Sequence, residues 1–422
     1  MTNPGVQTDV TFPDLTNRGP ARAWIATAAL AVTLLATMAT SVTVTGGLVA
    51  DDAGPTPKAY HALLVLAGLG LLARGKIARP RAELLVYFGV TIAATLVSYL
   101  VYEPQVAGLK LLISLYAALV GTGLGYLANR RIVLRACRMA GVAFAIVVTV
   151  KNVAHVPVFI AYFARPFAHP DVPSLAGGGL NLEATWLALA SFFMIGTTLF
   201  VPMTLLAAAT SALYASRVGV VIAVMAACAA VARARGMGWI KSSSNTASTN
   251  RTRVYVRRIA ALVFVGTSIG AVTAVVRVAR QYGDATYVAQ RFSAIGEDPG
   301  SLGRLVLWRG GLRVFEEHPL GVGAGNAVPT LRRVLGVDVA EDNLHNIYLQ
   351  QAVENGIPGV AALLLLAATI ARRVVRSRFS DQLLLFCAAY LVAGLIQFSG
   401  VDAIFWLAYG LQSGLAVHGA DV

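Results

Sequence analysis

Long apolar runs separated by short charged stretches make up most of this chain. A helix of about 20 apolar residues crosses the hydrocarbon core of a bilayer, and Arg and Lys mark the cytoplasmic ends of such helices. These two rules predict an all-α polytopic membrane protein with about 12 transmembrane helices and both termini in the cytoplasm. The expected spans cover residues 23–50, 59–73, 84–101, 111–128, 139–162, two crossings within 183–216, one helix from 218, then 259–276, 357–370, 383–399 and 401–417.

The stretch from residue 183 to residue 216 is too long for one ordinary span and short for two. The basic residues that follow the next apolar run belong inside, so both ends of this stretch must lie outside. We therefore expect two crossings with a tight inner turn near Phe200–Pro202. A re-entrant hairpin would also leave both ends of this stretch outside, and it stays open as an alternative.

One long polar segment, residues 277–355, interrupts the apolar pattern. Counting the membrane crossings before it places this segment outside the cytoplasm. We expect it to form a large extracytoplasmic loop that contains short helices and carries the chemistry. The predicted organisation is a disordered cytoplasmic arm at 1–22, spans one to nine within 23–276, the catalytic loop at 277–355, and spans ten to twelve within 356–422.

Composition agrees with a membrane protein. Of the 422 residues, 57% are hydrophobic and 13% are charged, whereas soluble domains carry about 25% charged residues. The net charge of +14 is interpreted as basic cytoplasmic loops at an anionic membrane surface. Nucleic-acid binding is not expected, because no basic segment is interleaved with stacking aromatics. Cys137, Cys228 and Cys387 lie far apart and outside any Cys/His cluster, so neither a zinc site nor a disulfide is expected.

Arg217 stands at the outer end of a predicted helix, and Gly219 leaves room beside it. Isolated basic residues are disfavoured on the outer side, so Arg217 is a candidate for binding a lipid phosphate. The alternative is a side chain that snorkels from a helix end.

Arg304 follows Ser301, a good N-cap, and is expected in the first turn of a helix. The residues Trp308, Leu312 and Phe315 follow at helical spacing and predict an apolar stripe that packs on the bundle or the bilayer. Arg309 and Arg313 fall on another face of that helix and are expected at the surface.

His345 is expected in the first turn of a helix over residues 344–355, capped by Asp342 or Asn343. The helix dipole at this position disfavours the imidazolium and keeps the ring neutral and basic. Glu341 nearby acts in the opposite direction, so the net effect stays open. A single His usually has a structural role. His345 is a candidate site residue only because Arg217 and Arg304 are expected on the same side of the membrane.

Three other features are weaker candidates. Glu354, at the far end of the His345 helix, is expected to be a catalytic partner or a helix-end contact to the outer arginines. Lys151 and His155 are four residues apart and so share one face of the fifth span. Ionisable residues at membrane depth are functional by default, with snorkelling as the equal alternative. The glycine-rich stretch 321–325 is expected to be a structural turn, since the strand and helix of a dinucleotide site are missing.

Taken together, several motifs resemble the O-antigen ligase and polymerase family. SLGRLVLW is similar to the family's S-G-R-x-x-x-W motif, GVGAGN to its glycine-rich turn ending in Asn326, and LHNIYLQQAVENGIPG to its His-Asn motif with His345 and Asn346. SRVG around Arg217 is similar to the Ser-Arg-Gly motif, with Val218 inserted before Gly219. GLNLEATWLALA matches the Asn-rich helix entry less well, because it lacks the usual Pro-Asn pair.

This resemblance implies a glycosyltransferase at the outer face of the cytoplasmic membrane that uses a glycan on undecaprenyl pyrophosphate and needs no metal or cofactor. Arg217 and Arg304 would hold the donor pyrophosphate, with Lys151 and His155 as further donor contacts. His345 would act on the acceptor hydroxyl or the donor, and Glu354, Asn346, Trp308 and Asn326 would support the site. Implied partners are the lipid-linked glycan, a glycan or lipid acceptor, and the bilayer.

A transporter or flippase of lipid-linked glycans is the competing hypothesis. Lys151, His155 and Asp402 would then form a charge path through the membrane. Such a protein predicts paired broken helices in two repeated halves, and the sequence has no convincing internal repeat. It would also leave the large polar loop without a purpose.

Overall fold

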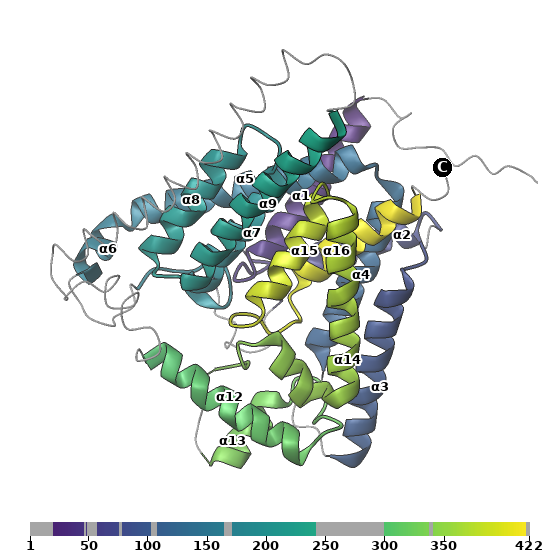
Figure 1. Ribbon diagram of the computed structural model, residues 1–422, viewed down its shortest axis with the longest axis vertical. Coiled ribbons are helices and arrows are strands. Elements are labelled where there is room, and N and C mark those ends of the chain that lie inside the picture. The colour runs from purple at the N-terminus through teal and green to yellow at the C-terminus, as the bar shows by residue number, and fades with distance from the viewer. Residues whose placement is uncertain are drawn as a thin grey trace, which may run out of the picture.

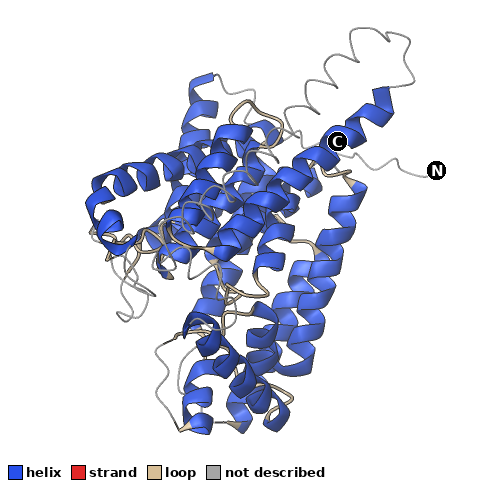
Figure 2. Cartoon of the chain, turned by 60° about the vertical axis from the view of Figure 1, so that its left-hand side comes forward, coloured by secondary structure: helices blue, strands red, loops and turns tan. Residues whose placement is uncertain are grey.

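The computed structural model describes residues 20–45, 48, 57–75, 78–102, 108–163, 171–241, 299–336 and 341–418. Within these ranges the chain is helical, with two isolated β-bridges, and Figure 2 draws only helices and loops there. The helices are α1 (Pro20–Met38), α2 (Ala59–Leu72), α3 (Ala82–Val101), α4 (Leu109–Leu127), α5 (Arg130–Ala154), α6 (Val156–Phe163), α7 (Gly179–Met194), α8 (Phe200–Leu213), α9 (Arg217–Lys241), α12 (Pro299–Glu317), α13 (Ala327–Leu335), α14 (Ile347–Arg376), α15 (Gln382–Ala393) and α16 (Ala403–His418).

The all-helical membrane class is confirmed. Five of the described helices, α3, α4, α5, α9 and α14, are long and apolar enough to cross a membrane, and five shorter helices are also apolar. The count of twelve spans stays a prediction. Residues 1–19 of the predicted arm at 1–22 and the expected ninth span at 259–276 lie outside the described residues, whereas residues 20–22 already belong to α1.

Glycines bring α4 and α16 into close contact. A Cβ atom on Gly121 would lie 2.4 Å from the carbonyl oxygen of Leu407, and one on Gly125 would lie 2.2 Å from that of Leu411. Reciprocally, a Cβ on Gly414 would meet the carbonyl oxygen of Thr122 at 2.1 Å. Small residues spaced by four are how helices approach closely in a bilayer, where apolar burial drives association only weakly.

The α7–α8 pair forms the expected antiparallel hairpin, but its turn lies earlier than predicted. Helix α7 ends at Met194, and the turn at residues 195–199 includes Gly196 with φ +88°. Helix α8 already begins at Phe200, which places Pro202 in its first turn. There the backbone N–H has no helical partner to lose, so Pro202 belongs to the helix and not to the turn.

Three other predicted spans are shorter or broken. Helix α1 ends at Met38 instead of residue 50, because the β-branched stretch after it forms bridges between Val42 and Leu48 and between Thr43 and Lys58. The fifth span divides into α5 and α6 at His155. The eleventh ends at Ala393, so that 394–402 is a loop.

The described parts of the polar segment, residues 299–336 and 341–355, pack at one end of the bundle, which we call the α12 end. Helices α12 and α13 lie at the bottom of Figure 1, beside the lower ends of α3 and α14, and form a separate apolar cluster with the start of α14. That cluster contains Leu307, Val314, Leu331 and Val353. The contacts between α7 and α15 show that the two run antiparallel: Gln382 donates to the carbonyl of Ile195, while Trp186 stacks on Tyr390. The N–H of Ile347, at the start of α14, donates to the carbonyl of Gly394, just after α15, at 2.7 Å, so the end of α15 and the start of α7 both lie at the α12 end.

The opposite end of the bundle gathers basic side chains against a few carboxylates. Arg130 pairs with Asp381 at 3.5 Å, and Arg373 pairs with Glu83 at 2.5 Å. Arg233 donates to the carbonyl oxygen of Ser380. Basic residues from α5, α9 and α14 thus lie together at this end, as the charge pattern along the chain requires.

Helix α14 is interrupted at Gly356, whose φ of +63° and ψ of −160° are not helical. The carbonyl oxygens of Val353 and Glu354 accept hydrogen bonds from the N–H groups of Val322 and Gly323, at 2.9 and 2.8 Å. The N–H of Ile357 donates back to Pro319 at 2.9 Å. The glycine-rich turn thus satisfies the backbone groups that the helix break would otherwise leave unpaired.

Substituting Gly356 with Ala should destabilise the protein by about 1–3 kcal/mol, from positive-φ strain alone. Its Cβ would also lie 2.3 Å from the carbonyl oxygen of Pro319. Thermal unfolding of the detergent-solubilised protein measures this. Gly89→Ala is the control, because nothing lies within 4 Å of its Cβ. Equal unfolding temperatures for the two variants would contradict the role assigned to the break.

Candidate functional site

His345 lies in the turn before α14 and not in its first helical turn, which corrects the sequence-based expectation. The helix begins at Ile347, and its N-cap is Asn346, whose Oδ1 accepts from the N–H groups of Tyr348 and Leu349 at 3.0 Å each. His345 itself has φ +50°. Neither Asp342 nor Asn343 is the cap, because the motif's own asparagine takes that position.

Both ring nitrogens of His345 face oxygen atoms. Nε2 lies 2.9 Å from Oε2 of Glu341, and Nδ1 lies 3.4 Å from the backbone oxygen of Gln397. The backbone N–H of His345 donates to Oδ1 of Asn343 at 2.7 Å. These contacts from two sides hold the ring in one orientation despite the left-handed backbone.

Glu341 hydrogen-bonds to His345 and also experiences the charge of Arg304. Its hydrogen bond with His345 holds the pKa of Glu341 below its usual range against the opposing effect of burial, and the charges of His345 and Arg304 add to this lowering. Arg304 is half-buried on α12. Because α12 begins at Pro299, Arg304 lies in its second turn and Ser301 is not the N-cap, contrary to expectation. His345 thus contacts Glu341 directly, while Arg304 acts on the same carboxylate through its charge.

Trp308 connects the helix of Arg304 to the turn of His345. Its Nε1–H donates to the backbone oxygen of Leu344 at 2.9 Å. The predicted apolar stripe is only partly correct, since Trp308 and Phe315 pack on the cluster while Leu312 is exposed. The buried face of this helix instead includes Leu307 and Val314. Arg309 and Arg313 are exposed, as predicted.

Glu354 is buried beneath the glycine-rich turn. Its Oε1 accepts from Nε2 of Gln350 at 2.5 Å, and the backbone of Gly325 and Ala327 also hydrogen-bonds to the carboxylate. Gln350 in turn accepts from the N–H of Leu344 at 2.9 Å. Glu354 therefore joins the glycine-rich turn to the residue that precedes His345.

Asn326 ends the glycine-rich turn and precedes α13. It is buried, and its Nδ2 donates to the backbone oxygen of Ala324 at 3.3 Å. From α3, Ser98 donates to the backbone oxygen of Gly321 at 2.9 Å, and Tyr99 donates to that of Ala324 at 2.9 Å. The turn is thus fixed on α3 and α14, as expected for a structural turn.

Arg217 is the first residue of α9 and half-buried. The preceding Ser216 donates to the backbone oxygen of Asn181 near the start of α7, at 3.3 Å. One turn further along α7, Trp186 packs on Phe398 with ring centroids 4.8 Å apart, and Phe398 adjoins Gln397. Arg217 therefore lies at the same α12 end of the bundle as His345.

Lys151 and His155 have local partners. The Lys151 ammonium pairs with the buried carboxylate of Glu183 at 2.5 Å. His155 caps the C-terminus of α5, and its Nδ1 donates to the backbone oxygen of Lys151 at 2.8 Å. Their contact with a donor stays a prediction.

Sequence reasoning missed several contacts around the site. Gln397 was expected inside a span, although the polar and glycine positions of 394–402 were a signal that the helix is broken there. Asp402, which accepts from the Tyr390 hydroxyl at 2.5 Å, belongs to the same loop. Lys110 at the start of α4 pairs with Asp342 at 3.1 Å. Glu183 was detectable as a lone carboxylate in an apolar run.

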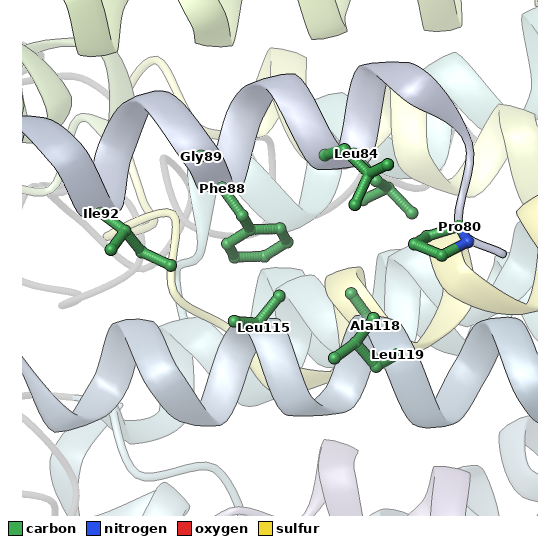
Figure 3. Close-up of a pocket in the computed structure, with 9 residues that line it drawn as sticks. Pro80, Leu84, Phe88, Gly89, Ile92, Leu115, Ala118 and Leu119 are labelled. Atoms are coloured by element: carbon green, nitrogen blue, oxygen red, sulfur yellow. The ribbon is translucent and has the colours of Figure 1, made fainter. Parts of the chain in front are cut away.

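An apolar hollow of about 210 Å³ lies between α3 and α4, away from these residues (Figure 3). No charged side chain lines it, so it supplies surface for hydrocarbon and no groups for chemistry. Its lining consists of Pro80, Leu84, Leu85, Phe88, Gly89, Ile92, Leu115, Ala118 and Leu119.

A family model for O-antigen ligases matches residues 110–364, which is more than half of the chain. The chain belongs to the O-antigen ligase family. The match includes the motifs of Arg217, Arg304 and His345. No curated protein matches the chain.

Membership in the O-antigen ligase family, together with the apolar helices, identifies a multi-pass membrane protein of a glycan-processing enzyme family. Within the described residues there is no group of three or more His, Cys, Asp or Glu that could hold a metal ion.

The pair of Glu341 and His345 should make stability depend on pH. The pKa of Glu341 is lowered on folding, so the contribution is present above the ordinary glutamate pKa and is lost as pH falls through the lowered value. We expect Glu341→Gln to flatten the acid side of a plot of unfolding temperature against pH.

Glu316→Gln, which removes an exposed carboxylate from α12, should keep the wild-type slope. An unchanged acid slope in Glu341→Gln would show that the hydrogen bond adds no stability in solution.

Proposed function

We propose that this protein is a glycosyltransferase that moves a glycan from a polyprenyl pyrophosphate onto an acceptor hydroxyl. The observation that carries the proposal is that Glu341 contacts His345 and also lies within the electrostatic influence of Arg304, which comes from a second motif resembling the same family. A fixed cation beside a general base is what this transfer needs, since one group develops negative charge while another loses a proton.

The acceptor oxygen attacks the anomeric carbon as the bond from that carbon to the pyrophosphate oxygen breaks. The bonding electrons leave with polyprenyl pyrophosphate, and the hydroxyl proton passes to His345. Guanidinium groups of Arg304 and Arg217 neutralise the developing charge on the leaving group and can hold phosphate oxygens in bidentate fashion. This chemistry serves a ligase and a polymerase equally, because the two differ in the acceptor.

Geometry favours Nε2 of His345 as the nitrogen that takes the proton. Nδ1 faces the backbone oxygen of Gln397, whereas Nε2 faces the side chain of Glu341, which is 51% exposed. A side chain can turn away to admit the acceptor, whereas a packed backbone carbonyl cannot. Before the substrate binds, the Glu341 side chain occupies the position at Nε2 that the acceptor hydroxyl then takes.

Charge distribution supports an extracytoplasmic site in the cytoplasmic membrane. The ends of α5, α9 and α14 that carry Arg130, Arg233 and Arg373 lie opposite the α12 end. If these basic ends face the cytoplasm, the candidate site faces outward, where polymers of the cell envelope are assembled.

The test is a transfer assay with purified protein, a lipid-linked glycan and an acceptor, read as release of polyprenyl pyrophosphate. Arg304→Ala, Arg217→Ala and His345→Ala should each lower the rate by about 100-fold or more, since each removes charge stabilisation or the general base. Arg309→Ala and Arg313→Ala are matched controls on exposed positions of α12 and should retain the wild-type rate. Full activity of both Arg304→Ala and His345→Ala would refute the proposal.

The same assay should give an unchanged rate in EDTA, because arginines stabilise the leaving group in this mechanism without Mg²⁺. The measurement is the rate before and after chelation, with Mg²⁺ added back. A rate that falls with EDTA and recovers with Mg²⁺ would contradict the assigned role of the arginines.

A further inference from the structure

Glu183 is a fully buried carboxylate that makes several contacts at the α12 end of the bundle. Its Oε1 lies 2.5 Å from the Lys151 ammonium and 2.8 Å from the Tyr214 hydroxyl. Its Oε2 accepts from the N–H of Leu175 at 2.7 Å and lies 3.4 Å from the Ser174 hydroxyl. Charged groups are buried at such cost only when they are paired and hydrogen-bonded.

These contacts join three segments around the start of α9. Lys151 belongs to the end of α5, and Leu175 belongs to the loop before α7. Tyr214 caps the end of α8, three residues before Arg217. The Tyr214 hydroxyl also hydrogen-bonds to the side-chain amide of Asn152 on α5.

The turn between Tyr214 and Arg217 has little freedom of its own. Ala215 has φ +52°, a conformation that non-glycine residues rarely adopt. The N–H of Ser216 donates to the backbone oxygen of Ser211 at 2.7 Å, and Gly219 would clash with Ser211 if it carried a Cβ, at 2.3 Å. A shift of Tyr214 is therefore transmitted to Arg217.

We propose that Glu183 is a positioning residue: through Tyr214 and Lys151 it fixes the turn that presents Arg217 to the donor pyrophosphate. This inference rests on the proposed function. The Lys151 ammonium then serves the donor indirectly, by compensating the charge of Glu183, instead of by touching phosphate.

The opposite end of the bundle offers a matched control. There Glu83 pairs with Arg373 at 2.5 Å and accepts from the Tyr409 hydroxyl at 3.0 Å. This group has the same composition, one carboxylate with one cation and one tyrosine, but it lies away from Arg217 and His345. Any effect that comes only from weakening an ion pair beside a tyrosine should appear in both groups.

The experiment compares Tyr214→Phe with Tyr409→Phe in the transfer assay. We expect Tyr214→Phe to raise the KM for the donor by about 5–10-fold, the usual value of one hydrogen bond, with little change in the KM for the acceptor. Tyr409→Phe should leave both constants unchanged. Equal effects of the two variants, or an effect of Tyr214→Phe on the acceptor alone, would overturn the inference.

A double-mutant cycle with Arg217 gives the sharper test. If Tyr214 acts through Arg217, Tyr214→Phe should change donor binding little once Arg217→Ala is present, whereas independent effects would multiply. Glu183→Gln with Lys151→Met removes both charges together and protects against loss of folding by an unpaired ammonium. This double variant should fold and still show weak donor binding; wild-type donor binding would overturn the inference.

Direct binding of undecaprenyl pyrophosphate to the purified variants separates this inference from the proposed function. If the wild-type protein binds this lipid but transfers no glycan, the proposed function fails, and the double-mutant cycle of Tyr214 and Arg217 measured by lipid binding still tests the inference. If glycan transfer proceeds but the effects of Tyr214→Phe and Arg217→Ala on donor binding multiply, the inference fails and the proposed function stands.

Discussion

The helix break at Gly356 is the constraint on which the polar half of this protein depends. It frees the carbonyl oxygens of Val353 and Glu354, and the N–H groups of the glycine-rich turn bind them. Unpaired backbone groups are especially costly within or beside a bilayer. The helix break therefore needs the N–H groups of the turn as donors, and the turn needs the carbonyl oxygens of the break as acceptors. The pairing attaches α12 and α13 to the bundle and fixes where α14 begins, which places His345.

Polar contacts hold the membrane bundle together where apolar burial cannot. Lipid tails are as apolar as the helix surfaces, so helices associate through close packing and hydrogen bonds. Thr95 on α3 donates to Asn355 on α14 at 2.9 Å, and Glu183 joins α5, α7 and the α8–α9 turn. Under the proposed function, these contacts set the distance between Arg217 on α9 and Arg304 on α12, which both address one pyrophosphate.

Several features were predictable because they depend on local rules. The all-helical membrane class followed from the length of the apolar runs, and the exposed positions of Arg309 and Arg313 followed from helical periodicity. Local rules also misled. Ser301 is a good N-cap but lies inside α12, and Asn346 caps α14 instead of Asp342 or Asn343. Capping propensities are similar among Ser, Asp and Asn, so tertiary packing chose between them.

By itself the sequence determined which residues belong to the membrane, which motifs carry charge, and that Arg304 and His345 fall in segments resembling one family. Only the tertiary structure decided what these residues contact. Glu341 next to His345, Gln397 behind it, and Glu183 beside Lys151 come together from positions 4, 52 and 32 residues apart. Periodicity describes one element at a time, and most of these partners are chosen by how elements pack, where each buried charge and each freed backbone group must find a partner.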